Sequence, residues 1–422
     1  MGIFSSLQNC VPGVSSEHNL RWYHILTASF IGYTAICQAL RFRHRNALQA
    51  KYPYKTRADC ARMTVDHAFE ISLMLSRYEF PLMTLRATQF ALFRTYGIPT
   101  ISKLLCQTGQ LSNKADVSKR YADTEIVVAE IKNFGVDHER SCGATARMNY
   151  IHSVYQKSGL ISNDDMIYTI ALFAMEPVKW IYRYEWRDLT TMEKCAIGTF
   201  WKSQGEAMNI DYSPLKSGKD RSWKDGLQWL NEIMEWTDDY EKRCMVPDPW
   251  NHMLANETTD LLLYKVSKRM KPYGRKVISA IMDDRLRTAM KYEVPPKSYF
   301  TTINAVFAIR RFILRWLMPP RPWFLPYRTI SPEPDSKTGR LHRKYYESEP
   351  WYVPATFGNR YGLGAWMNWL AGRPIPEKKF RPEGFLIEEI GPRRMEGKGM
   401  DEFKEMKERL MRAGRGGCPF PH

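Results

Sequence analysis

Apolar residues recur along most of the chain with the period of an α-helix rather than that of a β-strand. After Thr64 they return at three- and four-residue spacing, and runs of strict alternation are few. The pattern therefore predicts an all-α fold. Proline interrupts the interior of a helix, so Pro81 should divide two helices and Pro99 should follow the second. The predicted helices are 66–80, 81–98, 145–157, 163–177, 191–208, 224–242, 275–292 and 400–414.

Short sequence signals predict where some of these helices begin and end. Asn163 or Asp164 can cap one helix, because a short polar side chain accepts a hydrogen bond from the backbone of the first turn. Pro177 should end or kink that helix. Thr190 and Glu193 have the spacing of a capping box, in which each side chain bonds the backbone N–H of the other residue. Beyond the last charged helix we expect a loose tail.

An uncharged segment near the N-terminus predicts a membrane anchor. Residues 25–40 contain no Asp, Glu, Lys or Arg, and with Trp22 and Tyr23 ahead of them they approach the ~20 residues that cross a bilayer. Basic residues follow the segment, and positive charge favours the cytosolic side. We predict a single-pass anchor at 21–42, with 1–20 in the lumen. The alternatives are a buried core helix and a cleaved signal peptide, which would carry its basic residues ahead of the segment.

A second stretch with membrane character lies in the C-terminal half. Residues 299–327 are rich in apolar and aromatic side chains, but Arg310, Arg311 and Arg315 interrupt them. Such a stretch suits a basic amphipathic helix in the membrane interface better than a span. We place this interfacial helix near 300–318. The alternative is an ordinary packed helix with a solvated basic edge.

Composition and charge narrow the function classes. The 422 residues include 13 Trp, 23 Tyr and 19 Phe and carry a net charge of +17, with basic residues gathered beside apolar stretches. Because no recognised nucleic-acid motif occurs, we expect membrane lipid and not nucleic acid as a partner. Eight cysteines are scattered singly, which indicates a reducing compartment. No linker is evident, so we expect one helical domain over 43–372 and a C-terminal extension over 373–422, and leave the oligomeric state open.

His152 lies on the predicted helix 145–157 and is the histidine best placed for cofactor chemistry. Helical spacing puts Met148 and Tyr155 on its face, so its imidazole should emerge among apolar and aromatic groups. An axial haem ligand needs a neutral imidazole in such surroundings. The alternative is a core histidine whose ring nitrogens bond neighbours. Arg147 points away around the helix, so it suits a haem propionate or a neighbouring carboxylate better than the iron.

Three pairs of aspartates suggest a different enzyme. Prenyl-diphosphate enzymes bind magnesium through aspartate-rich helices, and this chain contains adjacent aspartates at 164–165, 238–239 and 283–284. The pairs lack a third aspartate one helical turn further on, so structural roles are favoured. A magnesium-dependent prenyl transferase is therefore the alternative enzyme. A membrane tether without catalytic activity is the alternative outside enzymology.

Long ordered blocks resemble the fungal MpaB family, the membrane-bound oxygenases of mycophenolic acid biosynthesis. The blocks are "EFPLMTLRATQFALFRTYGIPTISKLL", "TIALFAMEPVKWIYRYEWRDLTTMEKCAIGTFWKSQGEAM", "IMDDRLRTAMKYEVP" and "EEIGPRRMEGKGMDEF". The likeness covers most of the chain from about residue 51 onward. The family is in turn distantly similar to the bacterial latex-clearing rubber oxygenases.

The resemblance implies a fold and a reaction. Rubber oxygenases hold b-type haem in a globin-like, all-α core and cleave isoprenoid double bonds with dioxygen. For this chain the resemblance implies a haem b-dependent oxygenase in the endoplasmic reticulum membrane, with its catalytic domain in the cytosol. The substrate would be an apolar prenylated small molecule of the meroterpenoid class. In the MpaB family that substrate is a farnesylated phthalide.

The site residues are assigned partly by departures from the rubber oxygenases. Those enzymes carry an Arg followed closely by Lys and Thr, whereas Tyr150 and Ile151 follow Arg147 here, and their haem histidine lies on the next helix. His152 replaces that histidine and fits the RxxxxH pattern of the MpaB family. We predict that His152 binds the haem iron and that Arg147 orients haem or substrate. Tyr150 and Tyr155 are predicted to donate hydrogen bonds nearby.

Overall fold

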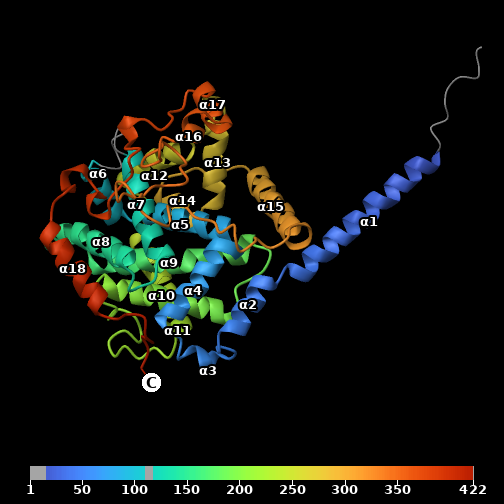
Figure 1. The fold of residues 1–422 in the computed structure, drawn as a ribbon. Helices are drawn as coiled ribbons and strands as arrows, with labels where there is room; N and C mark the ends of the chain where they lie inside the picture. The colour runs from blue at the N-terminus through green and yellow to red at the C-terminus, as the bar shows by residue number, and fades with distance from the viewer. Residues whose placement is uncertain (1–15, 110–116, 422) are drawn as a thin grey trace, which may run out of the picture.

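The computed structural model describes residues 16–109 and 117–421, and among these it is helical without any named strand, which confirms the all-α class. Figure 1 shows α1 projecting from a body formed by the other helices. The elements are α1 (Ser16–Leu40), α2 (Arg43–Lys51), α3 (Arg57–Cys60), α4 (Val65–Met74), η1 (Leu75–Glu79), α5 (Pro81–Thr95), α6 (Pro99–Gln107), α7 (Val117–Asn133), α8 (Glu139–Lys157), α9 (Asn163–Tyr184), α10 (Thr191–Ala207), α11 (Gly226–Cys244), α12 (Pro249–Leu262), η2 (Lys268–Met270), α13 (Lys271–Ile281), α14 (Asp284–Ala289), α15 (Lys297–Phe312), η3 (Ile313–Leu317), α16 (Phe357–Tyr361), α17 (Leu363–Leu370), η4 (Lys378–Phe380), η5 (Ile387–Glu389), η6 (Arg393–Met395) and α18 (Met400–Arg412).

The core is built around α9 and α10. Helix α9 packs on α5, α10 and α11, and α10 also packs on α4. Residues 166–177 of α9 are buried except at Thr169, because a helix that is apolar on nearly every face needs neighbours on every side. Glycines let α10 and α11 approach closely: a Cβ on Gly198 would lie 1.9 Å from the carbonyl oxygen of Gly226. Any larger residue at Gly198 would force these helices apart.

The starts of α9 and α8 differ from the prediction. Helix α9 is capped by Ser162, whose hydroxyl accepts a hydrogen bond from the Asp165 N–H, and not by Asn163 or Asp164. The Asn163 side chain bonds the backbone of Asp211 instead, at 2.8 and 2.9 Å, so it is not free to cap. Helix α8 begins at Glu139, six residues before its predicted start.

The prolines and capping signals have mixed outcomes. The capping box of Thr190 and Glu193 is present, and Pro81 is the first residue of α5. Pro177 does not end α9, which continues to Tyr184. The single helix predicted over 275–292 is wrong, because Asp283 caps a new helix, α14, through a 2.9 Å hydrogen bond from the Leu286 N–H.

Within the described residues, the stretch Arg21–Lys51 is long and apolar enough to cross a membrane by length and composition. Side chains of α1 from residue 21 to residue 36 are largely exposed, which fits a helix whose surroundings are not protein. The end of α1 is fixed to η3: the Tyr33 hydroxyl donates to the Leu317 carbonyl at 2.8 Å, and the Gln38 amide donates to the Arg315 carbonyl at 2.9 Å. The segment at 300–318 is helical as predicted, and none of α15 or η3 is buried.

The C-terminal extension is part of the body. Helix α18 packs on α8 with Phe403 and Leu410 buried. After α18 the chain bonds the N-terminal half, through Val65 N–H to the Gly417 carbonyl at 2.9 Å and Arg415 N–H to Asp137 at 2.9 Å. The expectation of a loose tail is therefore wrong for residues 413–421, because their backbone hydrogen bonds are made to the body.

Candidate active site

The side chains of α5 to α10 enclose a cavity in the centre of the body. Its volume, measured as the space open to the centre of a water molecule, is about 220 Å³, which is many times what one water molecule needs and leaves room for an organic ligand. Most of its lining is apolar, and the polar side chains at its wall include His152, Arg120 and Asp165. The lining residues are Leu92, Thr95, Tyr96, Ile101, Leu104, Leu105, Arg120, Thr124, Val127, Val128, Ile131, Met148, Ile151, His152, Leu160, Ile161, Asp165, Met166, Thr169, Ile170, Phe173, Trp201, Gln204, Met208, Ile390 and Gly391.

His152 lines this cavity from α8, together with Met148 and Ile151. Its Nδ1 is buried and has no hydrogen-bond partner. Burial, with a smaller contribution from the nearby charge of Arg120, lowers the pKa of His152 to about 4. The imidazole is therefore neutral near pH 7, with lone-pair electrons available to a metal. The Nδ1 of His44 is also buried without a partner among the described residues, so the feature that distinguishes His152 is its position at the cavity wall.

Arg120 is the cation at the cavity wall, and it comes from α7. Its guanidinium donates to the Thr124 hydroxyl at 2.6 Å, and that hydroxyl in turn donates to the Arg120 carbonyl at 3.0 Å. Among residues 16–109 and 117–421, no carboxylate lies within ion-pair distance of Arg120. A cation beside an apolar cavity without a carboxylate partner is suited to an anionic group of a bound ligand.

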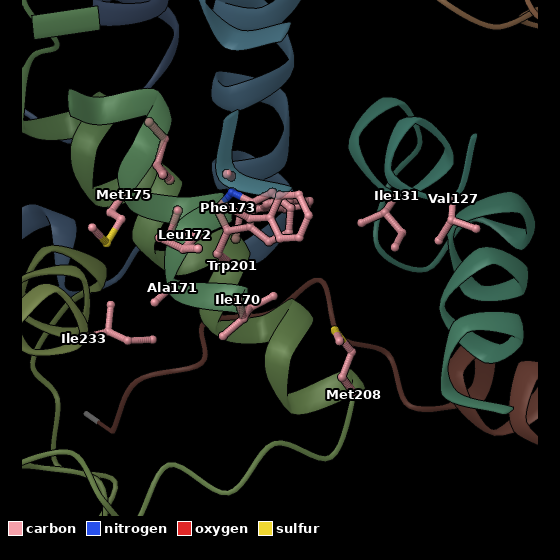
Figure 2. Close-up of a cluster of buried hydrophobic side chains, with 14 of the residues drawn as sticks. Val127, Ile131, Ile170, Ala171, Leu172, Phe173, Met175, Trp201, Met208 and Ile233 are labelled. Carbon is pink, nitrogen blue, oxygen red and sulfur yellow. The ribbon is translucent and has the colours of Figure 1, made fainter. Parts of the chain in front are cut away.

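Aromatic side chains form one wall of the cavity. Phe173 of α9 and Trp201 of α10 stack with their ring centroids 5.2 Å apart and their planes 16° apart. Figure 2 shows Val127 and Ile131 of α7 on the opposite side of the view, with Ile131 directed toward these rings. The two walls are apolar, so the space between them suits a hydrocarbon chain.

The C-terminal extension closes the cavity at Ile390 and Gly391. A buried ion pair on α7, Lys119 with Asp123 at 2.8 Å, holds this segment: Lys119 donates to the Gly391 carbonyl at 3.2 Å and Asp123 accepts from the Gly391 N–H at 3.3 Å. Gly391 has φ of +123° and lies against Ile151, where a Cβ would be 2.6 Å from the Ile151 methyl group. Only glycine fits here without displacing the wall next to His152.

Arg147 does not line the cavity. Its guanidinium is fully buried and donates to the backbone carbonyls of Ile390 at 2.8 Å, Lys398 at 2.9 Å and Met395 at 2.7 Å. Arg147 therefore holds the extension in place, and the cation expected from it at the site is supplied by Arg120. Helical geometry explains the difference, since residues five positions apart lie on different faces of α8.

The two tyrosines also lie away from the cavity. Tyr150 packs on Gly399, where a Cβ would be 1.9 Å from the Tyr150 ring. The Tyr155 hydroxyl accepts a hydrogen bond from Arg394 at 2.5 Å. Both side chains contact the C-terminal extension, and neither is among the residues that line the cavity.

The aspartate pairs have structural roles. Asp165 accepts hydrogen bonds from Thr100 at 2.9 Å and Tyr240 at 2.8 Å. Asp238 pairs with Arg285 at 3.0 Å, and Asp283 pairs with Arg94. In the part of the chain that the structure describes, no group of three His, Cys, Asp or Glu residues could hold a metal ion. These contacts weigh against a magnesium-dependent prenyl transferase.

Comparison with known proteins shows the family to which the chain belongs. It matches no family model. It is 44% identical over 403 residues to the ER-bound oxygenase mpaB' of Penicillium brevicompactum, with 95% of each chain covered. It is 41% identical over 356 residues to the ER-bound oxygenase mpaB of the same organism, with 84% of each covered. The chain belongs to the mpaB family of ER-bound oxygenases.

Membership of the mpaB family confirms the resemblance found in the sequence and makes the protein an oxidoreductase of the oxygenase class. The mpaB of Penicillium roqueforti (strain FM164) is 44% identical over 272 residues, which cover 64% of this chain and 91% of that protein. A tether without catalytic activity is therefore excluded. Relatives are named ER-bound, and α1 has the length and composition of a membrane anchor.

The sequence reasoning missed Arg120 and Thr124. Arg147 was predicted to be the cation of the site, although Tyr150 and Ile151 follow it; an Arg followed by a Thr one helical turn later occurs instead in α7, as Arg120 and Thr124. Helix α7 was not predicted, because Lys119, Asp123 and Glu130 are buried and interrupt its apolar period. The sequence "RYADT" at 120–124 was the pattern that could have identified this Arg and Thr.

Proposed function

We propose that this oxygenase uses haem b to cleave a C=C bond in the prenyl, farnesyl-type side chain of an aromatic or meroterpenoid substrate with dioxygen. The observation that carries the proposal is the neutral imidazole of His152, whose Nδ1 has no hydrogen-bond partner in the described part of the chain, at the wall of a largely apolar cavity. A single neutral imidazole in apolar surroundings is the donor set that b-type haem requires from a protein. The residues that line the cavity are therefore compatible with b-type haem.

Each part of the cavity has a task under this proposal. His152 would hold the haem iron, and Arg120, oriented by Thr124, would hold an anionic group such as a propionate. Bound haem would supply the activation of dioxygen. The stacked rings of Phe173 and Trp201 would pack along the prenyl chain and keep water away from the double bond.

The reaction balances without a further reductant. One double bond and one dioxygen molecule are consumed, and two carbonyl groups form, so that each carbon of the former double bond receives one oxygen atom. Both carbons are oxidised and dioxygen is reduced, which requires neither protons nor electrons from a partner. Product release is favoured because two shorter chains bury less apolar surface in the cavity than the intact chain does.

The proposed location follows from the substrate. An apolar prenyl chain partitions into lipid, so an enzyme anchored by α1 meets it at high local concentration. We propose a single-pass protein of the endoplasmic reticulum membrane whose helical domain lies in the cytosol. The Arg-rich residues 41–45 at the inner end of α1 support this orientation.

Isotope labelling tests the reaction. The purified full-length protein would be given a farnesylated phthalide under ¹⁸O₂, and the carbonyl products reduced at once with borohydride to prevent exchange with water. We expect two fragments that each carry one ¹⁸O atom, and loss of both in the His152→Ala variant. Fragments whose carbonyl oxygen comes from unlabelled water, or an epoxide or alcohol with an intact chain, would contradict cleavage of the double bond by dioxygen.

A further inference from the structure

Helices α16 and α17 expose more apolar surface than a solvated helix normally does. Leu363 is 80% exposed and Leu370 is 74% exposed, and Trp366, Met367 and Trp369 between them are each more than half exposed. Ala365 is the only buried residue of α17. Phe357 on α16 is 80% exposed. Contiguous apolar patches of this kind mark a surface that another phase or molecule covers.

A second exposed stripe runs along α15 and η3. Val306, Ile309, Phe312 and Trp316 follow one another at helical spacing and are all largely exposed. The arginines on the other side of α15 face the body: Arg310 pairs with Glu185 at 2.8 Å, and Arg311 donates to the Arg183 carbonyl. The apolar stripe is therefore directed outward because the polar side of the helix is anchored inward.

These two surfaces lie on the side of the body toward which α1 projects, as Figure 1 shows. Hydrogen bonds from Tyr33 and Gln38 hold η3 beside the last turns of α1. If α1 enters a bilayer, η3 must sit at the bilayer surface. Helix α13 packs on α15 and bridges the space toward α17, with Met270 and Tyr273 exposed at its start.

The charges of these segments indicate which partner the exposed apolar surface binds. No Asp or Glu occurs within 294–332 or within 351–376. Of the basic residues in the first range, Arg310 and Arg311 bond the body, whereas Lys297 and Arg321 are exposed. Exposed Lys276 and Arg360 flank the apolar residues. Apolar and cationic side chains interleaved without acidic ones are complementary to anionic lipid headgroups over an acyl layer.

We propose that α15, η3 and the pair α16–α17 form one lipid-binding surface that rests on the same leaflet that α1 enters. The body would thus be held by three contacts rather than by one flexible tether, and its orientation relative to the membrane would be fixed. The proposed binding partner of this surface is a lipid bilayer. The competing explanation is that a second copy of the chain covers it. This proposal does not depend on haem or on the reaction.

An environment-sensitive label on the full-length chain tests the surface. Cys10 and the partly exposed Cys244 and Cys418 would be replaced by Ser, and the dye NBD attached at Leu370→Cys. Met411→Cys on α18 is the matched control, since Met411 is an exposed apolar residue on a helix remote from α1. Both proteins would be reconstituted in vesicles of phosphatidylcholine and phosphatidylserine, with and without nitroxide-bearing lipid.

The two sites should respond differently. We expect the label at residue 370 to emit at shorter wavelength than the label at residue 411, and to be quenched at least twofold more by nitroxide lipid. Equal emission and equal quenching at both sites would overturn the proposal. A shift to shorter wavelength at residue 370 without quenching, together with energy transfer between labelled copies, would overturn it in favour of a second copy.

Discussion

Replacing Arg147 by Met should destabilise the protein without removing the chemistry of its site. The substitution keeps an apolar stem of similar length and deletes the guanidinium that binds three carbonyls of the C-terminal extension. The carbonyls of Ile390 and Met395 are buried. Each would be left without a hydrogen-bond donor, which costs about 1.5 kcal/mol of unfolding free energy. The carbonyl of Lys398 is partly exposed and can bond water. The expected loss is therefore about 3 kcal/mol of unfolding free energy.

The assay separates stability from function. Urea unfolding followed by circular dichroism gives the free energy, and haem per folded monomer is measured on the same preparations. Arg120→Met is the matched variant, because its guanidinium donates to one hydroxyl at the cavity wall. We expect Arg120→Met to change stability by less than about 1 kcal/mol and to weaken haem or substrate binding. If Arg147→Met were as stable as the wild type but inactive per folded molecule, Arg147 would act at the site and our assignment would be wrong.

Two further predictions concern a buried amine and the topology. Burial lowers the pKa of Lys132 from 10.5 to about 8, so below pH 8 its charge costs the folded state about 3 kcal/mol. Lys132→Met should therefore have a higher free energy of unfolding than the wild type at pH 7. This difference should shrink as pH rises from 8 to 10.5, because Lys132 loses its proton near pH 8 in the folded state and near pH 10.5 in the unfolded state. If urea unfolding at pH 7 shows no difference, the charge of Lys132 does not destabilise the folded state. Ser336→Asn creates a glycosylation sequon with Thr338 in an exposed loop, and in a eukaryotic host it should stay unmodified, whereas an endoglycosidase-sensitive mass shift would place the domain in the lumen.

The apolar period was enough to predict the central helices. Helices α5, α9, α10 and α11 are apolar or amphipathic, so their approximate positions follow from spacing, although α9 continues beyond Pro177 to Tyr184. Helix α7 was missed because its buried charges are satisfied by partners far away in sequence, such as the Gly391 backbone for Lys119. A sequence pattern records polarity but not the pairing that makes a buried charge tolerable.

The same limit explains what was and was not predicted about the site. His152 could be singled out because an isolated histidine among apolar residues is unusual, and the structure places it at a cavity without a partner for Nδ1. Arg147 seemed equally suitable, but helix spacing gives only the face of α8 on which it lies. That this face is covered by residues 390–398 is a tertiary fact, which no local pattern contains.

The most direct test of the account is the amount of haem bound per folded monomer in the wild type and in His152→Ala. His252→Ala is the control, because both ring nitrogens of His252 already have partners, the Met290 carbonyl and the Asn256 side chain. We predict one haem and an intense Soret band in the wild type and in the control. His152→Ala should lose most of the haem while circular dichroism shows it folded, and added imidazole should restore part of the band. Folded His152→Ala protein with full haem occupancy and an unshifted spectrum would contradict the account.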